Sequence, residues 1–394
     1  MSSIKKIIRY SFSLFFSQGV LLLFTPLLVY MYGLSNYGIY GIYISVFSFC
    51  SGFATMRVEL LFATEKSDKY FIVKFLLITC VCILCSVIVF FIYGYIMAIS
   101  VLIALLSAAG ITLTTYRENL LYERLRPTYM TNMVQPLLII TNQVAFYFCF
   151  SGSLGLLIGD ALSRLLVMCL LFSTAKIKVD FKDCLKNCHE FVKKYRGCML
   201  VNLGISIISY AKSTLLIPVC SYAMFDTKFI GILTLFSRYA LIPSALIGQG
   251  LALVFVARIT NENNIGTKLF ICRRLNFALY LISLLLVVIY ACTMLAYRYF
   301  DLTEPKGSVY LLSAYLLFTV TVFSSGPIRT IYLTSLKQKP LFLYDFLAIF
   351  GCVLIFFLFG VTYMSVTICL LNMAIFTILI NIRLESDVLS TWQK

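Results

Sequence analysis

Charge is the scarcest property of this sequence. Only 12% of the 394 residues are charged, whereas 61% are hydrophobic and the mean hydropathy is +0.97. Soluble domains contain about 25% charged and about 45–50% apolar residues, because a folded surface needs charge to stay dispersed. The composition therefore excludes a secreted disulfide scaffold, a DNA-binding domain and a cytosolic enzyme, and it leaves a polytopic membrane protein.

The motifs of enzymes and of metal centres are also missing. The single histidine, His189, lies close to Cys184 and Cys188, but a zinc site needs a fourth ligand and a recognised spacing. The sequence has no phosphate-binding glycine loop, no paired histidines and no nucleotide-binding domain. We therefore expect no catalytic residue, no metal and no cofactor, and we expect any transport to be secondary or driven by a partner.

Long apolar runs occupy most of the chain. One helical crossing needs about 20 apolar residues, and each connection adds about 8–12 more, so 394 residues accommodate about 12 helices. The runs are continuous rather than alternating, which excludes a β-barrel. We expect spans over residues 10–32, 37–62, 71–93, 96–116, 129–150, 154–174, 197–220, 229–257, 276–298, 308–331, 341–361 and 364–383.

The distribution of basic residues indicates an orientation. The odd-numbered loops 33–36, 94–95, 151–153 and 362–363 carry no charge, whereas the even-numbered loops hold most of the cations. Under the positive-inside rule, the even loops and both termini lie in the cytoplasm. The formal net charge of +16 is thus the signature of cytoplasmic loops rather than of a nucleic-acid partner.

The chain divides near its midpoint into two expected bundles. Loop 176–196 carries seven cations and reads as an amphipathic linker between an N-terminal six-helix bundle, 1–175, and a C-terminal one, 197–394. Residues 26–30 align with residues 218–222, and the start of the second span aligns with that of the eighth after one residue of slippage. This repetition predicts a pseudo-twofold axis along the membrane normal, with chance similarity among apolar helices as the alternative.

Several cations lie at membrane depth, where a charge costs several kcal/mol and normally faces a cavity or a partner. Arg164 is near the middle of the predicted sixth span and is a candidate anion contact in substrate binding. Asp160 lies one turn away, so the pair is either structural or functional. Lys212 and Arg238 have no acid within a helical turn. This favours a hydrated cavity in which both contact an anion.

Other charged positions are weaker candidates for a site. Arg57, at the inner end of the second span, is a further possible anion contact. Asp345 in the eleventh span and Asp160 in the sixth are candidates for proton or cation coupling.

Two segments of the chain carry distinctive motifs. The first consists of Thr25, Pro26, Tyr32, Gly33, the run Tyr37-Gly38-Ile39-Tyr40, and Met56, Arg57, Glu59 and Leu60. The second consists of Arg238, Ile242, Pro243, Ile247, Gly248, Gln249, Val254 and Phe255. They are similar to the signatures of the O-antigen and lipid-linked-oligosaccharide translocases, a branch of the multidrug/oligosaccharidyl-lipid/polysaccharide exporter superfamily.

The resemblance implies a V-shaped pair of six-helix bundles with a central cavity that opens alternately to the two sides. The implied cargo is an undecaprenyl-diphosphate-linked oligosaccharide, flipped to the periplasmic leaflet of a bacterial inner membrane. A polysaccharide polymerase, a chain-length regulator and membrane lipids are the implied partners. Two alternatives remain open: a multidrug or cation antiporter of the same superfamily, and a membrane glycan polymerase.

Overall fold

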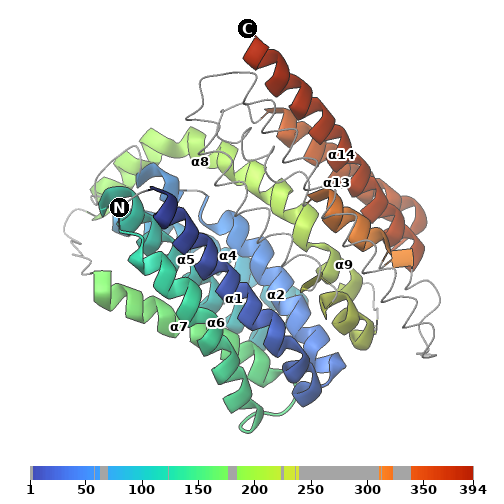
Figure 1. The fold of residues 1–394 in the computed structure, drawn as a ribbon, viewed down its shortest axis with the longest axis horizontal. Helices are drawn as coiled ribbons and strands as arrows, with labels where there is room; N and C mark the ends of the chain where they lie inside the picture. Colours follow the sequence, from blue (N-terminus) through green and yellow to red (C-terminus); the bar gives the residue numbers. More distant parts are fainter. Residues whose placement is uncertain are drawn as a thin grey trace. The chain divides into compact units, whose positions relative to one another are not determined.

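The computed structural model describes residues 3–56, 58–62, 70–122, 124–175, 184–222, 226–235, 237–238, 310–311, 313–322 and 339–393 (Figure 1). It divides into two compact units, Met1–Thr234 and Leu235–Lys394. The described residues are helical apart from short turns, and no strand occurs among them. Seven of their helices are long and apolar enough to cross a membrane, or eight if one bent pair counts as a span. The predicted all-α membrane fold is confirmed.

The first unit contains most of the described helices. Their bounds are α1 (Ser3–Tyr32), α2 (Leu34–Ala54), the 3-10 turn η1 (Val58–Leu61), α4 (Phe71–Tyr93), α5 (Tyr95–Tyr122), α6 (Arg126–Tyr147), α7 (Leu154–Ala175), α8 (Cys184–Thr214) and α9 (Leu216–Tyr222). Residues 227–235 are also helical. The helices α2 and α5 form the interior, since 61% of each span is buried, against 17% for α1 and 28% for α4.

Glycines make the tight turns between consecutive spans. Gly33 (φ 78°) separates α1 from α2, Gly94 (φ 86°) separates α4 from α5, and Gly152 (φ 66°) precedes α7. A positive φ costs glycine almost nothing, because it has no Cβ. All three lie in the charge-free loops that the sequence predicts to be outside.

Polar side chains inside the spans are satisfied locally. Ser107 and Thr114 of α5 donate to the carbonyl oxygens of Ile103 and Gly110, four residues earlier, at 2.6 and 2.8 Å. Lipid offers no hydrogen-bond partner, so such back-bonding lets a span carry hydroxyl groups at small cost. The hydroxyl groups of α5 can therefore face a neighbouring helix without destabilising the fold.

The predicted second span, 37–62, is broken at its C-terminal end. The helix α2 stops at Ala54, Met56 adopts a φ of 47°, and the chain resumes as η1. A methionine in the left-handed region is strained, so the prediction of one helix as far as residue 62 is wrong. Arg57 and Glu59 follow the break directly, but residues 60–62 are apolar again, so the sequence pattern does not distinguish a break from the charged end of one helix.

The helix α8 joins two segments that the sequence separates. It starts inside the expected linker and continues to Thr214, and α9 follows at a bend of 65°. Pro218 explains the bend, because it has no N–H to donate to the carbonyl of Thr214. The division into bundles 1–175 and 197–394 around the linker 176–196 stays a prediction.

In the second unit, α13 (Lys339–Phe359) and α14 (Tyr363–Gln393) pack together as consecutive helices joined at Gly360 (Figure 1). The amide of Asn372 donates to the carbonyl of Ala348 at 2.9 Å across this contact. The two helices confirm the predicted spans 341–361 and 364–383. The spans predicted over 229–257 and 276–298 lie largely or wholly outside the described residues, and the span 308–331 is described, as helix, at residues 310–311 and 313–322.

Candidate functional site

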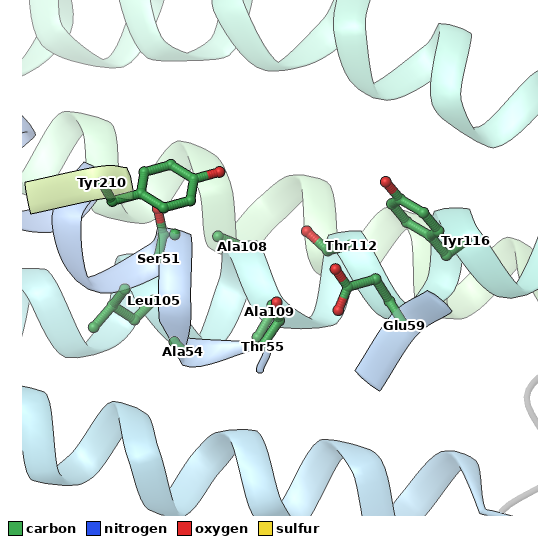
Figure 2. Close-up of a pocket in the computed structure, with 11 residues that line it drawn as sticks. Ser51, Ala54, Thr55, Glu59, Leu105, Ala108, Ala109, Thr112, Tyr116 and Tyr210 are labelled. Atoms are coloured by element: carbon green, nitrogen blue, oxygen red, sulfur yellow. The ribbon is translucent and has the colours of Figure 1, made fainter. Parts of the chain in front are cut away.

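A cavity of about 510 Å³ lies between α2, η1, α5 and α8 in the first unit (Figure 2). Its lining side chains are mostly small or hydroxyl-bearing. They are Ser51, Gly52, Ala54, Thr55, Glu59, Leu105, Ala108, Ala109, Thr112, Tyr116 and Tyr210. The small side chains of the alanines and the glycine leave room for the cavity, and the larger polar groups project into it at its two ends (Figure 2).

Glu59 supplies the negative charge of this cavity. Its side chain is 7% exposed, and it reaches the cavity because the chain turns at Met56 and re-enters as η1. Thr112 and Tyr116 of α5 lie beside it, one helical turn apart, so both hydroxyl groups face the carboxylate end of the cavity (Figure 2). No lysine or arginine is among the described residues that line the cavity.

Tyr210 forms the opposite end of the cavity. Its ring lies against Gly52 of α2, where a Cβ would overlap the ring carbons. Ser51 of α2 adds a hydroxyl group beside it, and Thr55, just past the end of α2, adds another near Ala109 (Figure 2). Gly52 thus brings an aromatic face from α8 to the wall of the cavity.

These groups together suit a cationic organic molecule. A carboxylate in a region of low dielectric attracts a positive charge strongly, and tyrosine rings bind cations through their faces. The volume falls in the range of small-molecule sites, about 300–1,000 Å³. Among the described residues, no cluster of three or more His, Cys, Asp or Glu side chains could hold a metal ion.

Asp160 and Arg164 form a separate ion-pair network within the first unit. Arg164 donates from Nε to Oδ2 of Asp160 at 2.7 Å and from Nη2 to Oδ1 at 3.1 Å. The hydroxyl groups of Tyr43 and Tyr40 donate to the same carboxylate at 2.9 and 3.5 Å. The guanidinium also lies 4.2 Å from the centre of the Phe47 ring. The predicted pair is thus present, with both carboxylate oxygens occupied.

The other predicted site residues are dispersed, and none lines the cavity. Lys212 on α8 is 4% exposed and Asp345 on α13 is 3% exposed. Arg238 is partly exposed, and Arg57 lies outside the described residues. The proposed roles of these residues in substrate binding and coupling stay predictions.

The sequence offered a partial signal for the cavity. Glu59 stands out as an acid at the end of an apolar run, but nothing in the sequence joins it to Tyr116 or Tyr210. A helix that is apolar all round does not reveal which face meets which neighbour. The link between these three residues needs the packing of α2, α5 and α8.

Comparisons with known proteins place this fold. No known family model and no curated sequence matches the chain. Among solved structures, it is similar to a multidrug resistance MATE family transporter of the MOP superfamily in an outward-facing conformation, with a TM-score of 0.57 and 12% identity over 98% of this chain and 96% of that one.

Two further solved structures agree. A mutant of the Vibrio cholerae MATE transporter VcmN has a TM-score of 0.55 and 14% identity over 98% of this chain and 97% of its own. A MOP superfamily transporter from Pyrococcus furiosus, described as having reverse polarity of its binding pocket, has a TM-score of 0.52 and 12% identity over 98% and 96%. These neighbours are transporters and not enzymes, in line with the sequence. The chain therefore has the fold of MATE-type transporters of the MOP superfamily over almost its whole length.

Proposed function

We propose that this chain is a secondary transporter that moves organic cations across the membrane, with the Glu59 cavity as their binding site. The observation that carries the proposal is a buried carboxylate facing hydroxyl and tyrosine side chains in a cavity of about 510 Å³. The solved structures that share this fold include a multidrug resistance transporter, which supports a transport role. Pocket polarity matters in this fold, since the reversed polarity of the Pyrococcus furiosus pocket is said to suggest a different function.

The carboxylate gives a direct test. Glu59→Gln keeps the shape of the side chain and removes its charge. Since a hydrogen bond to a charged group contributes about 1.5–3 kcal/mol and the amino groups of ethidium can donate one, we expect ethidium to bind the purified protein about ten- to hundred-fold more weakly. Ethidium efflux from cells that lack their own exporters falls in parallel.

A matched control separates the site from general charge loss. Asp226→Asn removes an exposed acid that accepts a bond from the backbone N–H of Lys228. We expect this variant to bind and export ethidium like the unmodified protein. Unchanged affinity and efflux in Glu59→Gln would show that the cavity is not the cation site.

A lipid-linked oligosaccharide flippase is the second candidate. Buried Lys212 favours it, because a cation enclosed in a spanning helix can contribute to a diphosphate site. If this reading is right, Lys212→Ala and Arg238→Ala abolish glycan export at normal expression, while Glu59→Gln spares it. A deletion strain with normal polysaccharide length and no redundant flippase would exclude the candidate.

A further inference from the structure

The start of α2 crosses the helical residues 227–235 at unusually short range. The hydroxyl oxygens of Ser35 and Thr227 are 2.5 Å apart. A Cβ on Gly38 would overlap the carbonyl oxygen of Thr227, and a Cβ on Gly231 would overlap the carbonyl oxygen of Leu34. We call this contact, made by residues 34–41 and 227–234, the glycine crossing.

The glycine crossing is reciprocal. Each glycine faces the carbonyl oxygen that lies four residues before the other glycine, because a shift of 193 residues converts Leu34 and Gly38 into Thr227 and Gly231. The next turn continues the pattern, since Gly41 faces the side chain of Thr234 at the same shift. A local twofold axis therefore passes through this contact, in the register that the sequence repeat predicts after its one-residue slippage.

Backbone rather than interlocked side chains makes this contact. Small residues allow two helices to approach closely in a membrane, where packing and Cα–H···O contacts replace the hydrophobic effect. The hydroxyl groups of Ser35 and Thr227 add a side-chain hydrogen bond across the crossing. Such a contact closes the gap between two helices through the direct approach of their backbones.

The glycine crossing and the Glu59 cavity lie at opposite ends of α2. Gly38 is in the first turns of the helix and Gly52 in the last, about 21 Å apart along its axis at 1.5 Å per residue. The orientation predicted from the basic loops puts the Gly38 end outside. One end of α2 is thus sealed against residues 227–234 while the cavity lies near the other end.

We propose that the glycine crossing is an outer gate, which is closed in this structure and must part once in every transport cycle. The proposal rests on the proposed transport function but on no particular cargo. A substituent on either glycine would meet backbone atoms of the other helix, which cannot rotate aside as a side chain can. Closure is therefore sensitive to a single methyl group at Gly38 or Gly231.

Cross-linking tests whether the gate must open. The close approach of Ser35 and Thr227 suits a disulfide, so the double variant Ser35→Cys, Thr227→Cys should cross-link under mild oxidation. We expect the oxidised protein to lose at least nine tenths of its transport and to regain it on reduction. Each single variant carries the same native cysteines and should keep its transport under oxidation. Full transport by protein shown to be cross-linked would overturn the proposal.

Labelling tests whether the gate closes through its glycines. In a Ser35→Cys background, Gly38→Ala or Gly231→Ala should raise the rate of reaction with a membrane-impermeant maleimide added outside several-fold. Gly19→Ala is the control, because a Cβ there meets nothing within 4 Å. An unchanged labelling rate in both gate variants would also overturn the proposal.

The two readouts separate the gate from the cargo. Labelling of Ser35→Cys needs no substrate, so it reports on the gate even if ethidium is not transported. If the unmodified protein does not transport ethidium, the proposed cation function is contradicted and the gate is not affected. Normal ethidium transport by protein with a cross-linked crossing would contradict the gate and leave the proposed cation function unaffected.

Discussion

The guanidinium of Arg164 and the carboxylate of Asp160 form a two-pronged ion pair inside the first unit, with N···O distances of 2.7 and 3.1 Å. The side chain of Asp160 is fully buried. Two charges enclosed in this way stabilise a fold little on balance, but the removal of one partner leaves the other charge without compensation. The pair therefore holds α7 against the tyrosines of α2 as an electrically neutral unit.

The first prediction concerns the removal of one charge from this pair. Asp160→Asn leaves the guanidinium of Arg164 buried without its counter-ion, so we expect a loss of about 3–5 kcal/mol in stability. Thermal unfolding of the purified protein in detergent measures it. The double variant Asp160→Leu, Arg164→Met should recover much of that stability. If Asp160→Asn unfolds at the original temperature, the pair does not hold the fold.

The second prediction compares two tyrosines that donate to the same carboxylate. Tyr43→Phe removes a hydrogen bond of 2.9 Å to Asp160, whereas Tyr40→Phe removes a longer one of 3.5 Å. A buried acceptor that loses a donor costs about 1–3 kcal/mol. We expect the lower unfolding temperature for Tyr43→Phe, and the opposite ranking would contradict the geometry of the network.

The third prediction isolates backbone strain at a turn. Gly94 has φ 86° and ψ 177°, a region that is almost closed to other residues, and a Cβ there would meet no atom within 4 Å. Gly94→Ala should therefore destabilise the protein by about 1–3 kcal/mol through the backbone alone. The helical control Gly19→Ala should shift the unfolding temperature the other way, since alanine is favoured over glycine in a helix by about 1 kcal/mol. Equal shifts of the unfolding temperature in both variants would show that the positive φ of Gly94 does not make alanine unfavourable there.

The fourth prediction concerns the tyrosine wall of the cavity. A Cβ at Gly52 overlaps the ring of Tyr210, so Gly52→Ala should displace the ring and change the affinity for ethidium at least several-fold. Gly204→Ala on α8 has the same gain in helix propensity and meets nothing within 4 Å, so it should bind as before. Equal affinity in the two variants would place the ligand away from Tyr210.

The spans were readable from the sequence where apolar runs end at glycine. The prediction of 71–93 agrees with α4 at both ends, because Gly94 stops the helix and the run before it is uninterrupted. The ion pair of Asp160 and Arg164 was readable from its four-residue spacing. In both cases the interaction is local, so neighbouring residues in the chain contain the information.

Other features depend on partners that are distant in the chain. Tyr43 reaches Asp160 across 117 residues, and Glu59 meets Tyr210 at one cavity only because α8 packs against α2. Uniformly apolar helices give no preferred face from which such contacts could be inferred. The break at Met56 was not predicted for a related reason, since the charged residues Arg57 and Glu59 beside it are equally compatible with the polar end of one continuous spanning helix.

The length of α8 has a mechanical consequence. Its 31 residues form a rod of about 46 Å, longer than the hydrocarbon core of about 30 Å. Near one end the fully buried Phe191 packs against the ring of Tyr70, and 19 residues further along Tyr210 forms the wall of the cavity. A continuous helix moves along its axis almost as a rigid body, so a displacement at one point is passed on to the rest of the helix. A force applied to α8 at Phe191 would therefore change the width of the binding cavity about 28 Å away.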